Sequence, residues 1–118
     1  MQQKMSEGTH SLSYASTGTG DTIVLIHGFG EDSRIWNHQV AFLENSYHLL
    51  IPDLPGTGAS SIGNSELSME SMATSIKQML DEEKIEQCIM LGHSMGGYVT
   101  LAFAEKYPER LQAFGLIH

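Results

Sequence analysis

Short apolar runs alternate with amphipathic stretches along the 118 residues of this chain. The apolar runs are rich in aliphatic and β-branched residues and predict strands buried on both faces, over residues 22–27, 47–51, 88–91 and 111–117. The amphipathic stretches predict helices over residues 32–45, from Ser68 onward and over residues 95–107. An opening hairpin is also predicted, with Gly8 in its turn and residues 9–15 as its second strand. This order is typical of an α/β fold with a mostly parallel sheet.

Caps and apolar spacing support the first two helices. Asp32 or Ser33 can cap the first helix, and Trp36 and Phe42 are interpreted as its packing residues. The clearest helix begins at Ser68, and its apolar positions fall on one face: Met69, Met72, Ala73, Ile76, Met79 and Leu80. We interpret this face as core packing rather than as a groove for a partner.

Composition and charge narrow the classes of protein. The length matches one domain, and 41% hydrophobic with 17% charged residues is a globular balance. A net charge of −8 argues against nucleic acid or an anionic membrane as a partner. Residues 1–5 lack the apolar stretch of a secretory signal, and the single cysteine, Cys88, fits a reducing compartment. We expect a cytoplasmic protein, with a mature secreted form as the open alternative.

The most informative segment is residues 88–97, Cys-Ile-Met-Leu-Gly-His-Ser-Met-Gly-Gly. It places Gly-x-Ser-x-Gly between a predicted strand and a predicted helix, which is the context of a nucleophile elbow. So sharp a turn strains the central residue and crowds its neighbours, which explains Gly92 and Gly96. Ser94 is then an exposed nucleophile, and the Met95 amide faces a bound carbonyl oxygen. The alternatives are a closely packed glycine turn or an anion site at the helix amino end.

Three motifs follow one another in the chain: residues 27–30 (His-Gly-Phe-Gly), residues 53–60 (Asp-Leu-Pro-Gly-Thr-Gly-Ala-Ser) and residues 92–97 (Gly-His-Ser-Met-Gly-Gly). With them the chain resembles the α/β-hydrolase superfamily, in particular its esterase-like members with a His-Gly loop, over about residues 9–117. The resemblance implies the α/β-hydrolase fold and a serine hydrolase acting on a carboxylic ester or related acyl substrate. A serine nucleophile disfavours the dehalogenase and epoxide hydrolase branches, which would require an aspartate there.

The resemblance also implies roles for the loop after the first buried strand. Phe29 is expected to donate its backbone amide to an oxyanion hole, opposite the amide of Met95. His27 and Gly28 are expected to support the shape of that loop. His93, next to the nucleophile, is expected to shape the turn rather than to transfer protons.

Other polar residues carry less information about function. Asp53 is expected to brace its own loop by accepting backbone hydrogen bonds, and Cys88 to be an inert core thiol. The six histidines share no metal-site spacing, so we expect no metal, and nothing in the sequence calls for a cofactor. A nucleotide-binding domain is excluded, because neither G-x-G-x-x-G nor G-x-x-x-x-G-K-[ST] occurs.

The sequence lacks the partners that a serine nucleophile needs, a base and an acid that orients it. In this family they follow the serine in the order Asp or Glu, then His. Downstream of the elbow lie only Glu105, Glu109 and His118, whose positions do not match those of the family's acid and base. We therefore interpret residues 1–118 as the amino-terminal part of a single α/β-hydrolase domain, truncated after the strand that follows the elbow helix. The lid and the carboxyl-terminal strands would be absent.

This interpretation has consequences for activity and partners. Removal of the base typically lowers turnover by about a million-fold, so the chain alone is expected to be nearly inactive. Its last strand would leave a hydrophobic edge that can support self-association. The alternative is a non-catalytic α/β-hydrolase-like fragment that binds a small ligand or a partner chain. The expected partner of the parent enzyme is a small ester-type molecule, and the fold does not specify which.

Overall fold

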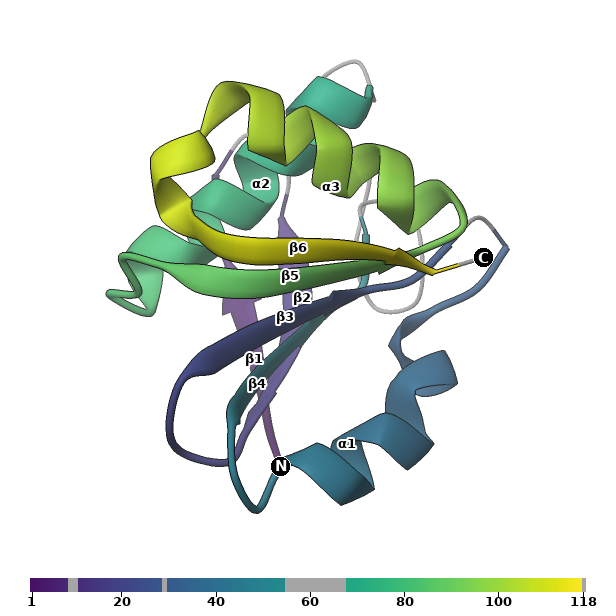
Figure 1. Cartoon of the computed structure of the whole chain (residues 1–118), viewed down its shortest axis with the longest axis vertical. Helices are drawn as coiled ribbons and strands as arrows, with labels where there is room; N and C mark the ends of the chain where they lie inside the picture. Colours follow the sequence, from purple (N-terminus) through teal and green to yellow (C-terminus); the bar gives the residue numbers. More distant parts are fainter. Residues whose placement is uncertain (9–10, 29, 55–67, 118) are drawn as a thin grey trace.

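A six-stranded sheet forms the centre of the computed structural model, which describes residues 1–8, 11–28, 30–54 and 68–117. The strand order is β1-β2-β4-β3-β5-β6 (Figure 1). The strands are β1 Gln2–Ser6, β2 Leu12–Thr17, β3 Thr22–Ile26, β4 His48–Pro52, β5 Cys88–His93 and β6 Leu111–Ile117. The first two strands pair antiparallel with each other and with β4, whereas β4, β3, β5 and β6 run parallel. The predicted α/β architecture with a mostly parallel sheet is thus confirmed.

The predicted strand ends differ from the observed ones by a few residues. The hairpin is present, but its second strand begins at Leu12 and continues to Thr17, with residues 9 and 10 outside the described part. The strand β4 includes Pro52, and β5 continues to His93. The strand β6 has the predicted bounds, Leu111–Ile117.

Helices cover both faces of the sheet (Figure 1). The helices α2, Met69–Glu82, and α3, Met95–Lys106, pack on one face, and the 3₁₀ turn η1, Ser33–Trp36, continues into α1, Asn37–Leu43, on the other. A second 3₁₀ turn, η2, Pro108–Arg110, leads from α3 into β6. Side chains of β3 alternate between the two layers: Val24 and Ile26 join the cluster under α2 and α3, and Ile23 and Leu25 join the cluster under η1.

The helix predictions were confirmed for α2 and partly wrong for α1. Ser68 caps α2 in a capping box with Ser71, and the predicted apolar face lies in the core. The segment after Asp32 starts as a 3₁₀ turn and ends its α-helix at Leu43, so it is shorter than predicted. Phe42 is 82% exposed, so its interpretation as a packing residue is wrong. In a helix of seven residues it falls on the face opposite the buried Val40.

The topology determines where a site can form. The chain passes from β3 to β4 on one side and then from β4 to β5 on the other side of β3. Because the strands β3 and β5 are parallel neighbours, the loops that follow them meet at the carboxyl ends of the strands. Open α/β sheets bind ligands at such a reversal of strand order.

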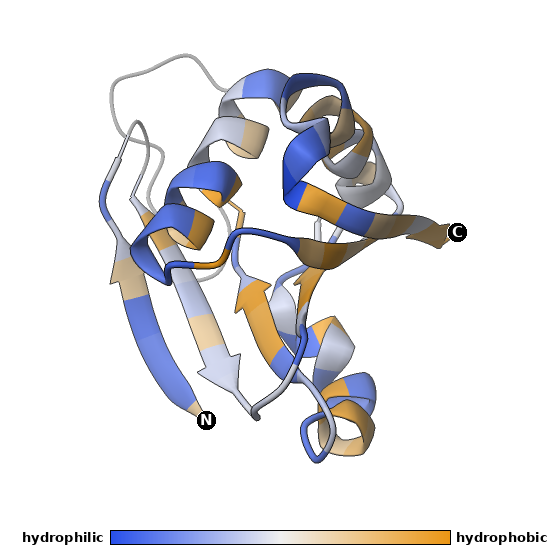
Figure 2. Cartoon of the chain, turned by 60° about the vertical axis from the view of Figure 1, so that its left-hand side comes forward, coloured by the Kyte–Doolittle hydropathy of each residue, from blue (hydrophilic) through white to orange (hydrophobic). Residues whose placement is uncertain are grey.

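The two edges of the sheet differ in polarity. β1 is largely hydrophilic, whereas β6 is largely hydrophobic toward the carboxyl end (Figure 2). Phe114, Leu116 and Ile117 of β6 are each at least 40% exposed. β6 therefore presents the apolar edge expected from the sequence. Among the described residues, no helix is both long enough and apolar enough to cross a membrane.

Candidate active site

Ser94 stands at the junction between β5 and α3 in an unusual backbone conformation. Its φ is 56° and its ψ is −118°, a region that residues other than glycine rarely adopt. The residue is exposed, and its side chain makes no capping bond to α3. Its amide donates to the carbonyl of Ile117 (2.9 Å), which ties the turn to β6. The hydroxyl is thus presented outward from a strained, well-anchored turn.

The helix after Ser94 packs tightly on β3, which requires the second glycine of the motif. A Cβ on Gly96 would lie 2.5 Å from the carbonyl oxygen of Ile26 and 2.6 Å from that of His27. Any side chain here would push α3 away from β3. Because Met95 is the first residue of α3, its amide has no carbonyl partner within the helix and lies next to Ser94.

His27, directly after β3, is fully buried and uses both ring nitrogens. The amide of Leu54 donates to its Nε2 (2.9 Å), so the proton of the neutral ring is on Nδ1. Nδ1 then donates to the carbonyl oxygen of Gly28 (2.8 Å). The imidazole therefore connects the loop after β3 with the loop after β4.

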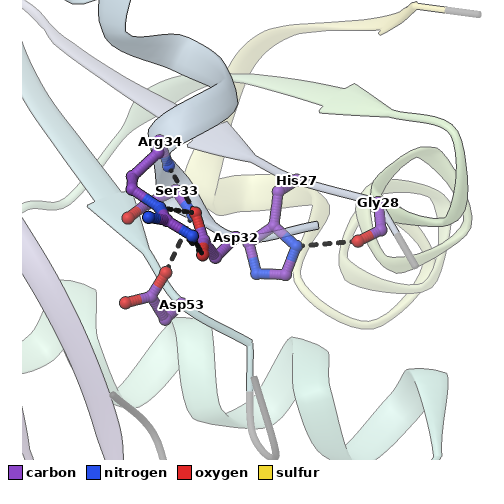
Figure 3. Close-up of polar contacts among 6 residues, drawn as sticks. All are labelled: His27, Gly28, Asp32, Ser33, Arg34 and Asp53. Atoms are coloured by element: carbon purple, nitrogen blue, oxygen red, sulfur yellow. Dashed lines mark hydrogen bonds and ion pairs between the residues drawn. The ribbon is translucent and has the colours of Figure 1, made fainter. Parts of the chain in front are cut away.

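Two carboxylates anchor the other end of the loop after β3. Asp53 accepts a hydrogen bond from the amide of Ser33 (2.8 Å), as Figure 3 shows. Asp32 caps η1 by accepting from the amide of Arg34 (2.9 Å), and it also pairs with the Arg34 guanidinium (2.8 Å). The hydrogen bonds from the Arg34 side chain and amide lower the pKa of Asp32 to about 2. Asp53 thus braces the loop after β3, whereas the expected brace within its own loop falls on residues outside the described part.

Glu31 connects the loop after β3 to the elbow, and sequence reasoning did not single it out. Its Oε1 accepts from the amide of Gly28 (2.7 Å) and contacts Nδ1 of His93 (3.0 Å). Partial burial raises the pKa of this carboxyl, but the hydrogen bonds from His93 and Gly28 outweigh burial and leave the pKa below its usual value. The ring of His93 also meets the ring of Trp36 edge to face. No periodicity or motif marks residue 31.

The described residues that the sequence predicted for the site converge at the carboxyl ends of β3 and β5. A Cβ on Gly28 would lie 2.9 Å from Cβ of Ser94, so the loop after β3 touches the elbow. Ser94, Gly28 and Met95 are therefore neighbours, and Phe29 lies outside the described residues. A cavity of about 240 Å³ opens beside the serine and is lined by Ser94, Gly97, Tyr98, Leu101, Leu116 and Ile117.

The family model for the α/β-hydrolase fold matches residues 21–117, which include the elbow and both neighbouring loops. This chain belongs to the α/β-hydrolase family. It is 36% identical over 104 residues to a pimeloyl-(acyl-carrier protein) methyl ester esterase of Aeromonas hydrophila, covering 87% of this chain and 39% of that enzyme. It is also 36% identical over 105 residues to the dihydrolipoyllysine-residue acetyltransferase component of the acetoin cleaving system of Cupriavidus necator, covering 88% and 28% of the two chains.

Among solved structures, a thermophilic esterase from Thermogutta terrifontis superimposes with a TM-score of 0.90 at 33% identity. The match covers 98% of this α/β hydrolase and 45% of the esterase chain. The chain thus spans less than half the length of the relatives that it matches.

The carboxylates downstream of the elbow lie far from Ser94. Glu105 is in the last turn of α3, and Glu109 is in η2, just before β6 begins. Because α3 runs back along β5 for 12 residues, both lie toward the opposite end of the sheet. His118 is outside the described residues. Within the ranges that the structure describes, no group of three or more His, Cys, Asp or Glu could hold a metal ion.

Proposed function

We propose that the protein containing this chain is a serine hydrolase that cleaves a carboxylic ester or a related acyl substrate. The observation that carries the proposal is the exposed Ser94 at φ 56°, between a parallel strand and a helix amino end, in contact with the loop after β3. Two of the relatives are esterases by name, which supports this class of substrate.

In the proposed reaction, Oγ of Ser94 attacks the substrate carbonyl carbon while a histidine outside this chain accepts the hydroxyl proton. The Met95 amide and the amide assigned by sequence to Phe29 donate to the carbonyl oxygen as it becomes negative. Collapse of this intermediate breaks the ester bond, and the histidine gives its proton to the leaving alcohol. Water then cleaves the acyl-enzyme by the same steps and restores Ser94.

The base and the acid would come from the part of the domain that this chain does not contain. Its relatives are more than twice as long, and Glu31, a carboxylate that contacts the elbow among the described residues, is held by Gly28 and His93. The missing part would cover the exposed apolar edge at Phe114, Leu116 and Ile117. We therefore propose that residues 1–118 alone have little or no activity.

The test is labelling and turnover in the full-length protein. A fluorophosphonate should add to Ser94, as read from the mass of the peptide that contains it, and p-nitrophenyl esters should be hydrolysed. Ser94→Ala should remove both signals, whereas Ser46→Ala, at an exposed turn position, should keep them. Labelling that persists in Ser94→Ala, or turnover that it leaves unchanged, would contradict the proposal.

A second candidate rests on the apolar edge itself. A non-catalytic fragment could use β6 to bind a partner chain, including a second copy of itself, or bind a small ligand beside it. Sedimentation of residues 1–118 tests whether this edge binds a second copy of the chain. A dimer that Phe114→Lys disperses would favour self-association, and a monomer would argue against it.

A further inference from the structure

Glu31 contacts the two residues that directly precede the groups assigned to the chemistry. Gly28, which precedes Phe29, donates its amide to Oε1 over 2.7 Å. His93, which precedes Ser94, meets the same oxygen over 3.0 Å. One carboxylate oxygen therefore joins the loop after β3 (residues 27–32, called the oxyanion loop below) to the nucleophile elbow, across 62 residues of sequence.

Glu31 contacts both the amide and the carbonyl oxygen of Gly28. In addition to the amide of Gly28, its carbonyl oxygen accepts from the backbone amide of Glu31 (3.3 Å) and from Nδ1 of His27 (2.8 Å). That carbonyl belongs to the peptide group whose N–H the sequence assigns to the oxyanion hole. Glu31 and His27 therefore hold the Gly28 side of that peptide group, which is planar.

There is little free space around this contact. A Cβ on Gly28 would lie 2.7 Å from Oε1 of Glu31, 2.8 Å from the carbonyl oxygen of His93 and 2.9 Å from Cβ of Ser94. The loop is thus held close to the elbow on one side and by a carboxylate on the other. Loss of the carboxylate would leave the Gly28 amide without this acceptor and allow the loop to move.

We propose that Glu31 is a positioning residue that fixes the oxyanion loop against the nucleophile elbow. The inference rests on the proposed hydrolase function, and adds a residue that acts through Gly28 and His93 rather than on the substrate. Donors in an oxyanion hole act because they are already aligned when charge develops. A misplacement of about 1 Å can cost roughly 100-fold in rate.

Three substitutions in the full-length protein separate alignment from charge. Glu31→Ala removes the acceptor and should lower kcat for a p-nitrophenyl ester by about 10- to 100-fold, with KM changed less than about threefold. Glu31→Gln keeps an oxygen for the Gly28 amide and should stay within about fivefold of the parent. Glu31→Asp keeps the charge but is too short to meet both donors, and should lower kcat by about 10-fold. Glu105→Gln, at an exposed position in α3, is the matched control and should not change kcat.

A second readout distinguishes alignment from a general loss of structure. A trifluoromethyl ketone adds to the serine and places a negative oxygen in the oxyanion hole. Its inhibition constant should rise in Glu31→Ala by the same factor as kcat/KM falls, while the midpoint of thermal unfolding stays close to that of the parent.

The results distinguish failure of the positioning role from failure of the proposed function. An active parent with Glu31→Ala at parental kcat overturns the positioning role alone. A parent that neither turns over esters nor labels at Ser94 overturns the proposed function, and this inference with it. If Glu31→Ala does not fold, Glu31→Asp decides: parental kcat overturns the role, and a selective fall in kcat with an unchanged unfolding midpoint supports it.

Discussion

Gly92 and Gly96 are in direct backbone contact across the nucleophile elbow. A Cβ built on Gly92 would lie 2.3 Å from the carbonyl oxygen of Gly96 and 2.5 Å from Oγ1 of Thr100. Thr100 in turn donates its hydroxyl to the same Gly96 carbonyl (2.8 Å). The first two turns of α3 therefore lie directly against the end of β5, and the spacing Gly-x-Ser-x-Gly reflects this contact.

Substitution of Gly92 by alanine should destabilise the protein. The new methyl group has no room, because its nearest neighbours are backbone atoms that cannot rotate away. We expect Gly92→Ala to lower the free energy of unfolding by about 1–3 kcal/mol in urea titrations. Gly97→Ala is the matched control: its Cβ would meet nothing closer than 3.5 Å, so it should be neutral or stabilising by up to about 1 kcal/mol. Equal losses in both variants would contradict this explanation.

The positive φ of Ser94 predicts that glycine is more stable than alanine at this position. Ser94→Gly and Ser94→Ala both remove the hydroxyl, but only glycine adopts φ 56° without cost. We expect the glycine variant to be more stable than the alanine variant by about 1 kcal/mol in urea unfolding, which is the strain less the extra entropy of glycine. At Ser46, where φ is not positive, the order of the same pair should reverse. Alanine and glycine of equal stability at position 94 would show that the turn is not strained.

Local patterns predicted most of the fold, whereas contacts between distant segments did not appear in the sequence. Ser68 and the apolar face after it predicted α2, because capping and helical spacing act within a few residues. Phe42 was placed wrongly, since an apolar residue in a short helix can face either way. The role of Glu31 was invisible, because its partner His93 becomes a neighbour only when β3 and β5 pair. The motif around Ser94 was the exception, because the spacing of Gly92 and Gly96 is required by the close contact between β5 and α3.

Cys88 should be unreactive in the folded protein. Its side chain is fully buried at the start of β5, and burial raises the pKa of its thiol to about 12, against a smaller opposing effect of Arg110. Alkylation requires the thiolate, so iodoacetamide at pH 8 should leave Cys88 unmodified in native protein and label it after unfolding in urea. Mass analysis of the peptide that contains Cys88 measures both. Similar labelling rates in the two states would contradict the burial of this thiol.

Asp32 should make a contribution to stability that disappears in acid. Its hydrogen bonds from Arg34 lower its pKa from the ordinary 3.8 to about 2, so folding favours the charged form. The contribution is therefore fully present above about pH 4, decreases as the pH falls below the unfolded-state pKa, and is lost near pH 2. At pH 7, Asp32→Ala should cost about 1 kcal/mol through loss of the cap at η1.

Urea unfolding of Asp32→Ala and of the parent at pH 7, 5, 4 and 3 tests this sign. The difference between the two should be constant from pH 7 to 5 and smaller at pH 3, because the parent loses its advantage as the Asp32 carboxyl binds a proton. Asp21→Ala, which alters an exposed aspartate in the turn before β3, is the control and should show little difference at neutral pH. A difference that grows on acidification would mean that the charged form of Asp32 is not the one that folding favours.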